Sequence, residues 1–457
     1  MISSKNKEPE KANSRLQILF GFPKFGTSLI LGLETFSMYT LYSDIFGLNS
    51  ILTGIALAFG YIAIALAQLI FGWLSDGHYT KLGRRKPYLL LLSPILGLSF
   101  IFLFIPNMFL PDLNNQIILF IWLFIFEGLF KFCYAVTIPY QSWMVEVFPN
   151  KQRPRVSQIQ NIFNYIGVGL MAIITFFIFA DIYDDFKSNP YLIPIEYVSI
   201  VIIAGITIWV IFYLIVLIFP TEPYHEIQHK GLGENIKTIK ENKNLMRVIL
   251  SNGIAAIAWA IFASGTLNFN KVVLGLENTQ YLIIGVILGI GTLIFLSYWR
   301  RRIETKGKKK NLLQLFIIAM ILSPVTLLGL LSDYIYPLIT GMIFTFSMGL
   351  IRAGMNLFPY IIYADISQDK EKESGQLLAG LYTGFPSMIL NIFQALGMIL
   401  LGVLGTLPLI TINSIEFSIG LTLWGPICSV MLIIAYLYTK KYVTLDFDWE
   451  KTNQNER

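Results

Sequence analysis

Long apolar runs recur along the whole chain, and they constrain its fold more than any other feature. Twelve segments reach about 20 residues or more, the length with which an α-helix crosses the hydrocarbon core of a bilayer. They cover residues 18–42, 51–75, 88–109, 117–143, 157–180, 197–219, 246–270, 279–299, 312–332, 336–363, 376–404 and 417–438. Only 14% of the 457 residues are charged, too few to cover a soluble protein. The sequence therefore predicts an all-α, multi-pass membrane protein and excludes soluble enzymes, nucleic-acid binders and disordered chains.

The basic residues predict how the chain is oriented in the membrane. Most of the 34 Lys and Arg residues lie in the two tails and in every second loop, whereas the other loops hold only Lys187 and Lys271. Under the positive-inside rule, the loops rich in Lys and Arg face the cytoplasm. We therefore expect both termini and the central loop to be cytoplasmic, and we attribute the net charge of +6 to this orientation. The first apolar run is too long for a cleaved signal peptide, and without targeting signals we expect the cell (plasma) membrane.

The cysteines give no sign of a disulfide or a metal site. Cys133 and Cys428 both fall inside apolar segments, which predicts two buried thiols that pack in the core. No Cys/His pair has the spacing of metal ligands, so we expect neither a metal nor another cofactor.

The polar segment 220–245 divides the predicted spans into two groups of six. We predict an N-tail (1–17), an N-terminal bundle (18–219), a central loop (220–245), a C-terminal bundle (246–438) and a C-tail (439–457). Two motifs recur in both groups at nearly the same offset: Gly83-Arg84-Arg85-Lys86 matches Gly307-Lys308-Lys309-Lys310, and Pro139-Tyr140 matches Pro359-Tyr360. This repetition indicates a duplicated six-helix unit, an architecture in which transporters bind their substrate between the halves near the midplane.

The segment 72–87, between the second and third spans, carries the most specific motif. A basic turn that only sets topology would explain its Lys and Arg residues. It would not explain Gly72 and Asp76, which lie one helical turn apart at the end of a span. Glycine lets another helix approach closely, and a carboxylate there can pair with an arginine or a helix N-terminus. We therefore predict a cytoplasmic gate formed by Gly72, Asp76, Gly83, Arg84, Arg85, Lys86 and, in the second half, Arg300.

This motif resembles the signature loop of the major facilitator superfamily. The Gly83–Pro87 ending, the Ile138–Tyr140 segment followed by Glu146, and Ala364-Asp365 resemble one branch of it more narrowly. That branch contains the glycoside–pentoside–hexuronide:cation symporters and the plant-type sucrose:proton symporters. The resemblance implies the major facilitator fold, with two pseudo-symmetric six-helix bundles that work by alternating access. It also implies that spans 1, 4, 7 and 10 line a central cavity.

Several positions differ from the pattern of that branch. Acidic cation ligands of melibiose-type symporters correspond here to Ile64 and Gln68, two sugar-binding acids to Ser28 and Thr137, a lysine of span 11 to Asn391, and an arginine of sucrose symporters to Gln141. These replacements disfavour a sodium site of the melibiose kind. They also leave room for a second class of cargo, because carriers of lysophospholipids and other amphiphiles occur in the same branch.

Five charged residues fall in the predicted spans away from their end residues: Lys24, Glu34, Glu127, Lys131 and Arg352. A charge at mid-bilayer costs about 2.5–3.5 kcal/mol, so it normally faces a partner or a wet cavity. Glu127 and Lys131 are four residues apart on one helix and can pair with each other, and Lys24 can extend towards the interface. All three histidines lie in predicted loops, so a group that loads a proton within the membrane has to be a carboxylate. We predict Glu34 and Glu127 for this role, and we place Glu34 first because Glu127 already has Lys131 nearby.

These observations predict a secondary active transporter that moves a sugar, glycoside or related polar solute together with protons. We expect it to act as a monomer in the lipid bilayer. The predicted substrate-binding residues are Glu34, Tyr39, Glu127, Lys131, Thr137, Gln141, Trp259, Asn268, Arg352, Asn356 and Asn391. Two alternatives stay open: an amphiphile carrier of the same branch, and a non-transporting membrane sensor, which would need a signalling domain or a long tail. A membrane enzyme would need clustered acids or a histidine-metal site, whereas the charges here are scattered, so we do not expect an enzyme.

Overall fold

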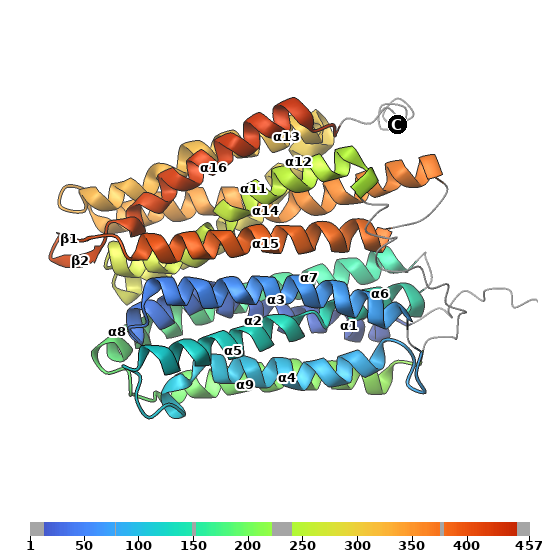
Figure 1. Cartoon of the computed structure of the whole chain (residues 1–457), viewed down its shortest axis with the longest axis horizontal. Coiled ribbons are helices and arrows are strands. Elements are labelled where there is room, and N and C mark those ends of the chain that lie inside the picture. The colour runs from blue at the N-terminus through green and yellow to red at the C-terminus, as the bar shows by residue number, and fades with distance from the viewer. Residues whose placement is uncertain (1–12, 78, 149–151, 222–239, 375–378, 446–457) are drawn as a thin grey trace, which may run out of the picture.

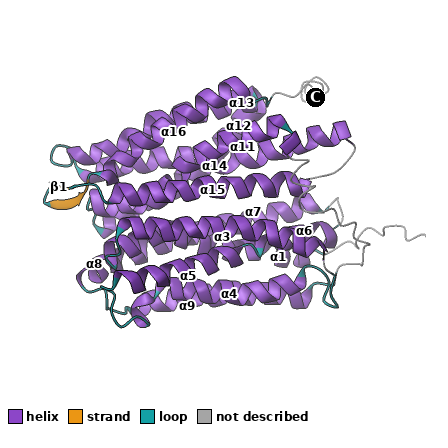
Figure 2. Cartoon of the chain, in the orientation of Figure 1, coloured by secondary structure: helices purple, strands orange, loops and turns teal. Residues whose placement is uncertain are grey.

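The computed structural model describes residues 13–77, 79–148, 152–221, 240–374 and 379–445. The helices run roughly parallel to one long axis, with α1–α9 on one side and α11–α16 on the other (Figure 1). Apart from one small hairpin, almost all of the described chain is helical (Figure 2). The predicted all-α class is therefore confirmed.

The N-terminal half follows the first six predicted spans within a few residues. Its elements are α1 (Ser14–Gly21), α2 (Pro23–Thr40), the π-helical turn η1 (Leu41–Ile45), α3 (Ser50–Gly77), α4 (Lys86–Phe104), η2 (Pro106–Met108), α5 (Gln116–Tyr134), α6 (Thr137–Val147), α7 (Arg153–Ile173), the π-helical turn η3 (Ile174–Phe179), α8 (Ala180–Ser188) and α9 (Ile195–Ile218). Because α5 and α6 are nearly continuous, they form one span together.

The C-terminal half repeats this order of long helices. Its elements are α11 (Lys243–Asn268), the π-helical turn η4 (Phe269–Val273), α12 (Asn278–Lys306), α13 (Lys308–Leu322), the 3-10 segment η5 (Ser323–Leu331), α14 (Pro337–Ser374), α15 (Ala379–Gly405), the antiparallel strands β1 (Leu409–Ile412) and β2 (Ile415–Ser418), and α16 (Gly420–Tyr442). We call the end of the molecule that carries β1 and β2 the hairpin end, and the opposite end, where α1 begins and α16 ends, the termini end (Figure 1).

Eleven helical segments of the described chain are long and apolar enough to cross a membrane. The fifth predicted span corresponds to α7 and η3 and is not among these eleven segments. Helix α7 nevertheless packs along α2 at the centre of the half. A β-carbon at Gly167 would lie 2.4 Å from the backbone oxygen of Phe25 on α2, so glycine lets the two helices approach closely.

The two halves share a local structure at the hairpin end. Helix α2 continues into η1 and α11 into η4, and a glycine with a left-handed backbone follows each turn: Gly47 has φ 69° and Gly275 has φ 57°. The same backbone hydrogen bond closes both turns, from Phe46 to Leu41 and from Leu274 to Phe269, each at 3.0 Å. The two turns therefore have equivalent geometry, as a duplicated unit would.

This feature corrects the predicted ends of spans 1 and 7. We expected these spans to end at residues 42 and 270, with Asp44 and Lys271 in loops. The helical structure continues to Ile45 and Val273, so both charged residues belong to the spans. Lys271 is buried there.

The halves meet most closely where α3 packs against α15. A β-carbon at Gly54 of α3 would lie 2.6 Å from the backbone oxygen of Met398, and one at Gly402 of α15 would lie 2.6 Å from that of Ser50. Real side chains do not approach a carbonyl this closely, so both positions require glycine for the backbones to touch. Because Gly54 and Ser50 lie in the first turns of α3, the tight contact lies towards the hairpin end.

Candidate functional site

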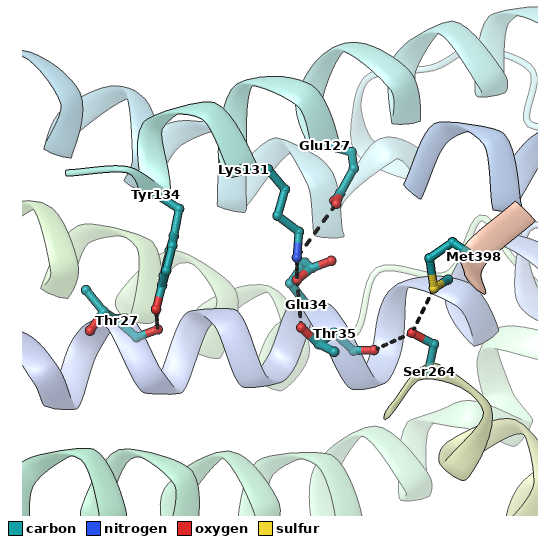
Figure 3. A network of polar contacts seen from close by, with 8 residues as sticks. All are labelled: Thr27, Glu34, Thr35, Glu127, Lys131, Tyr134, Ser264 and Met398. Carbon is teal, nitrogen blue, oxygen red and sulfur yellow. Dashed lines mark hydrogen bonds and ion pairs between the residues drawn. The ribbon is translucent and has the colours of Figure 1, made fainter. Parts of the chain in front are cut away.

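Three charged side chains converge inside the N-terminal half. The ammonium of Lys131 on α5 lies 2.5 Å from Oε2 of Glu34 on α2 and 4.0 Å from Oε1 of Glu127, one turn earlier on α5 (Figure 3). All three residues are almost completely buried. We call this group the carboxylate triad.

The helices around the triad hold it in place. A β-carbon at Gly60 of α3 would overlap Oε1 of Glu127, so the absence of a side chain there makes room for the carboxylate. The next residue, Tyr61, presents its ring to Lys131, with 4.7 Å between the ammonium and the ring centroid. Such a contact stabilises a cation when the site excludes water. Helices α2, α3 and α5 thus each contribute to the triad.

The triad contains the ion pair that the sequence predicted and a shorter one that it did not. Glu127 and Lys131 pair within one helix, as expected. The shorter ion pair joins Lys131 to Glu34 between helices. Neither carboxylate oxygen of Glu127 accepts a hydrogen bond from the described residues. Lys131 does lie near Glu127, the reason for placing Glu34 first, but it lies still nearer to Glu34, so Glu127 is the less compensated carboxylate.

A short chain of contacts links the triad to the opposite half. The Thr35 hydroxyl donates to Oε2 of Glu34 at 3.0 Å, and the Thr35 backbone oxygen accepts from the hydroxyl of Ser264 on α11 at 3.3 Å (Figure 3). Ser264 also lies 3.4 Å from the sulfur of Met398 on α15. Glu34 of α2 belongs to the triad, and the next residue, Thr35, hydrogen-bonds both to Glu34 and to the C-terminal half.

Other contacts join the halves towards the hairpin end. The Tyr39 hydroxyl donates to the backbone oxygen of Leu401 at 3.2 Å, and the amide of Asn268 donates to the carboxylate of Asp44. Both contacts combine a residue of the α2–η1 segment with one of the C-terminal half. Asp44, two residues beyond the predicted end of the first span, was not among the predicted site residues.

A further pair of polar residues joins the halves between α3 and α15. The amide of Asn391 on α15 donates to Oε1 of Gln68 on α3 at 3.3 Å. These two positions differ from the family pattern in the sequence, and the structure brings them together as a neutral, hydrogen-bonded pair.

Arg352 and Asn356 are one turn apart on α14, and both retain exposed surface. The guanidinium of Arg352 lies over the ring of Phe36 on α2, with 4.4 Å to the ring centroid. Of the remaining predicted binding residues, Thr137 and Trp259 are buried. Thr137 donates its hydroxyl to the backbone oxygen of Tyr134 at 3.0 Å, Trp259 packs against Phe262, and Gln141 is half-buried.

The predicted gate segment is folded closely onto its own half. The backbone of Gly83 is left-handed, with φ 91°, and pairs with Thr80 in a tight turn. Arg85 donates to the Ser75 hydroxyl at 2.7 Å, and the buried ammonium of Lys86 donates to the backbone oxygen of Phe219 at 2.7 Å.

Among the other predicted gate residues, Gly72 does not show the close helix approach that the motif predicts. A β-carbon at Gly72 would meet only Ile138, at an ordinary 3.7 Å. Arg84 is half-buried, Arg300 is exposed on α12, and the side chain of Asp76 lies outside the described residues. The gate therefore stays a prediction.

The two cysteines lie in different halves, and both are free and buried, as predicted.

The structure also places Tyr61, Asp44 and Lys271 in the spans, near the predicted residues. No charge or motif in the sequence distinguished Tyr61 from the other aromatic residues. Asp44 and Lys271 were detectable in principle, since apolar residues flank both.

Comparison with known proteins gives one family match and one curated relative. The family described as "MFS/sugar transport protein" matches residues 19–414. An uncharacterized symporter of Synechocystis sp. is 26% identical over 182 residues, which cover 39% of this chain. The match spans only 33% of the length of that relative.

Several solved structures have a similar fold. A D-xylose-proton symporter aligns with a TM-score of 0.65 and 13% identity, covering 94% of this chain and 97% of that one. A bacterial homologue of the human lysosomal transporter Spinster, inward-facing and unoccupied, gives 0.64 and 14%, with the same coverage. The nucleoside transporter NupG gives 0.61 and 16%, covering 93% of this chain and 99% of that one. At these identities the likeness concerns the fold alone, and it agrees with the predicted arrangement of twelve spans.

Proposed function

Because the chain belongs to the MFS/sugar transport protein family, we propose that it is a secondary active transporter that moves a sugar, glycoside or related polar solute together with protons. The chain is a multi-pass membrane protein, and we place it in the cell membrane with both termini in the cytoplasm. The observation that carries the proposal is the buried carboxylate triad and its link through Thr35 to the opposite half. The triad can bind a proton, and the link can transmit the change to the interface between the halves.

Charge balance explains why the triad would bind a proton. Two carboxylates face one ammonium, so the ionised triad carries one uncompensated negative charge inside the protein. Burying an unpaired charge is costly unless a partner or a proton neutralises it. Glu127 has no hydrogen bond from the described residues and the longer distance to Lys131, so we assign the proton to Glu127. Glu34 then keeps the ion pair.

Release of that proton would alter the interface. Lys131 would then be attracted by two charged carboxylates and would move from Glu34 towards Glu127. Because Oε2 of Glu34 also accepts from Thr35, and Thr35 contacts Ser264 of α11, this movement changes the contacts of α2 with the C-terminal half. Protonation and the relative position of the halves are thereby coupled.

The contacts at the hairpin end fit one state of an alternating-access cycle. With cytoplasmic termini, the hairpin end faces the outside. The bonds Tyr39–Leu401 and Asp44–Asn268 and the close packing at Gly402 join the halves there. These contacts support a state closed to the outside, and they have to separate before a solute can enter from that side. In the opposite state, the segment 72–87 and Arg300 would close the termini end.

The test is uptake into proteoliposomes that contain the purified full chain. We would offer radiolabelled monosaccharides, disaccharides and glycosides, with either a pH gradient or a sodium gradient. The expected result is accumulation of at least one sugar when the outside is acidic, and loss of this accumulation with a protonophore. Accumulation driven by sodium alone would contradict the proton assignment.

A lysophospholipid belongs in the same panel, because an amphiphile carrier of the same branch would share this fold. Transfer of the lysophospholipid without uptake of any sugar would show that the cargo is an amphiphile and not a sugar. Movement of neither class in liposomes that contain folded protein would contradict transport and favour a membrane sensor.

A further inference from the structure

Arg352 faces the inside of the molecule. Ile339, Ile343 and Phe346 are exposed and mark the outer, lipid-facing side of α14. At 3.6 residues per turn, Arg352 projects about 180° away from Ile343. Its contact with Phe36 on α2 agrees with this direction, because α2 belongs to the other half. The exposed part of the Arg352 side chain therefore faces the region between the halves.

The guanidinium of Arg352 has no anionic partner in the described chain. No carboxylate oxygen of the described residues lies within 4.0 Å of it, and it lies over the ring of Phe36. A guanidinium that stacks on a ring keeps its five N–H donors in the plane, where they match a planar or tetrahedral oxyanion. An unpaired charge away from bulk water is costly, so this arginine is poised for a ligand that carries a negative charge.

A second cation lies on the facing surface of α2. Lys24, Ser28, Leu31 and Thr35 recur at helical spacing and are all partly exposed, whereas Thr27, Leu29, Ile30, Leu33 and Glu34 are buried. Thr35 contacts Ser264 of the opposite half and Ser28 donates to Asn164 of α7, so this stripe lies along the border between α7 and the C-terminal bundle. The ammonium of Lys24, like the guanidinium of Arg352, has no ion-pair partner in the described chain. Both halves thus present an uncompensated cation to the region between them.

We propose that the transported solute carries an oxyanion, a carboxylate or a phosphate, and that Arg352 binds it. This inference rests on the proposed transport function and specifies its cargo. Arg352 would grip the oxyanion with two parallel N–H donors, the geometry that makes arginine a strong carboxylate and phosphate ligand. Asn356, exposed one turn further along α14, lies on the same side and can bind a neighbouring hydroxyl. The neutral part of the solute would then lie towards α2.

The test compares ligands that differ only in charge. Binding of glucose, glucuronate and glucose 6-phosphate to the full-length chain in nanodiscs would be measured by calorimetry, and their uptake in proteoliposomes. A lysophospholipid with a phosphate and its neutral monoacylglycerol counterpart form a second matched pair. The variants are Arg352→Gln, Arg352→Lys and, as a control, Arg247→Gln, which removes an exposed arginine of α11.

The expected result is that an anionic ligand binds more tightly than its neutral counterpart. Arg352→Gln should then weaken the anionic ligand on the order of 30-fold or more and leave the neutral one unchanged. Arg352→Lys should restore part of this loss and show that the variant folds, while Arg247→Gln should match the unmodified chain. Preference for glucuronate identifies a carboxylate, and preference for glucose 6-phosphate or the lysophospholipid identifies a phosphate.

Two outcomes would overturn the proposal. In the first, neutral and anionic ligands bind equally; in the second, Arg352→Gln weakens both classes alike. In either case, uptake of a neutral sugar would leave the proposed transport function intact. If no ligand of the panel is bound or transported by folded protein, both the anionic cargo and the transport of polar solutes are contradicted.

Discussion

The two glutamates of the carboxylate triad are predicted to contribute very differently to stability. Glu34→Gln replaces a charged contact of 2.5 Å to Lys131 by a neutral one. Breaking a buried ion pair costs about 3–5 kcal/mol, because the remaining charge stays uncompensated. Glu127 lies 4.0 Å from the same ammonium and can take over part of the pairing. We therefore expect a loss of about 2–3 kcal/mol for Glu34→Gln.

Glu127→Gln should have a much smaller effect. This substitution removes a carboxylate that accepts no hydrogen bond from the described residues, and it leaves Glu34 and Lys131 as a balanced pair. We expect a change within about 1 kcal/mol, with stabilisation as the favoured sign. The difference comes from geometry alone, since the two substitutions are chemically identical.

The assay is thermal or denaturant unfolding of the purified variants in the same detergent at pH 7.5, followed by tryptophan fluorescence. Glu416→Gln on β2 serves as a control, because this glutamate is exposed. The expected order of stability places Glu127→Gln close to the control and Glu34→Gln clearly below both. Equal losses at the two positions, or the reverse order, would refute the description of the triad.

Two glycine substitutions test the packing around the site. Gly60→Ala should push Glu127 out of place and destabilise the chain by about 1–3 kcal/mol in the same assay, whereas Gly169→Ala, where a β-carbon meets no atom within 4 Å, should be neutral; equal effects would show that Gly60 does not shape the triad. Gly402→Val should force α15 away from Ser50 and make cysteines placed at the hairpin end more reactive to a membrane-impermeant thiol reagent. Unchanged reactivity would contradict closure of the hairpin end by this contact.

The fold was largely predictable because the membrane imposes its own length on each apolar run. The spans of α3, α4 and α9 match the predicted segments within a few residues. The errors concern places where polar residues continue a helix. The turns η1 and η4 keep Asp44 and Lys271 in helical structure beyond the apolar runs, and hydropathy alone does not register such an extension.

The candidate site was predictable in composition but only partly in pairing. Charges within apolar spans are costly, so their positions identify Glu34, Glu127 and Lys131 as functional candidates. Sequence spacing detects only contacts within one helix, which is why Glu127 was expected to pair with Lys131. The shorter contact with Glu34 depends on how α2 packs against α5, and the sequence contains no signal for that packing. The hydrogen bond between Asn391 and Gln68 has the same origin, since the two residues lie in different halves.

The central claim is that the triad couples a proton to the movement of the halves. The most direct measurement compares Glu127→Gln with the unmodified chain in proteoliposomes, using the solute identified by the uptake panel. We predict that the variant loses accumulation driven by a pH gradient but still exchanges labelled solute for unlabelled solute across the membrane. Accumulation driven by the pH gradient at the level of the unmodified chain would contradict the claim.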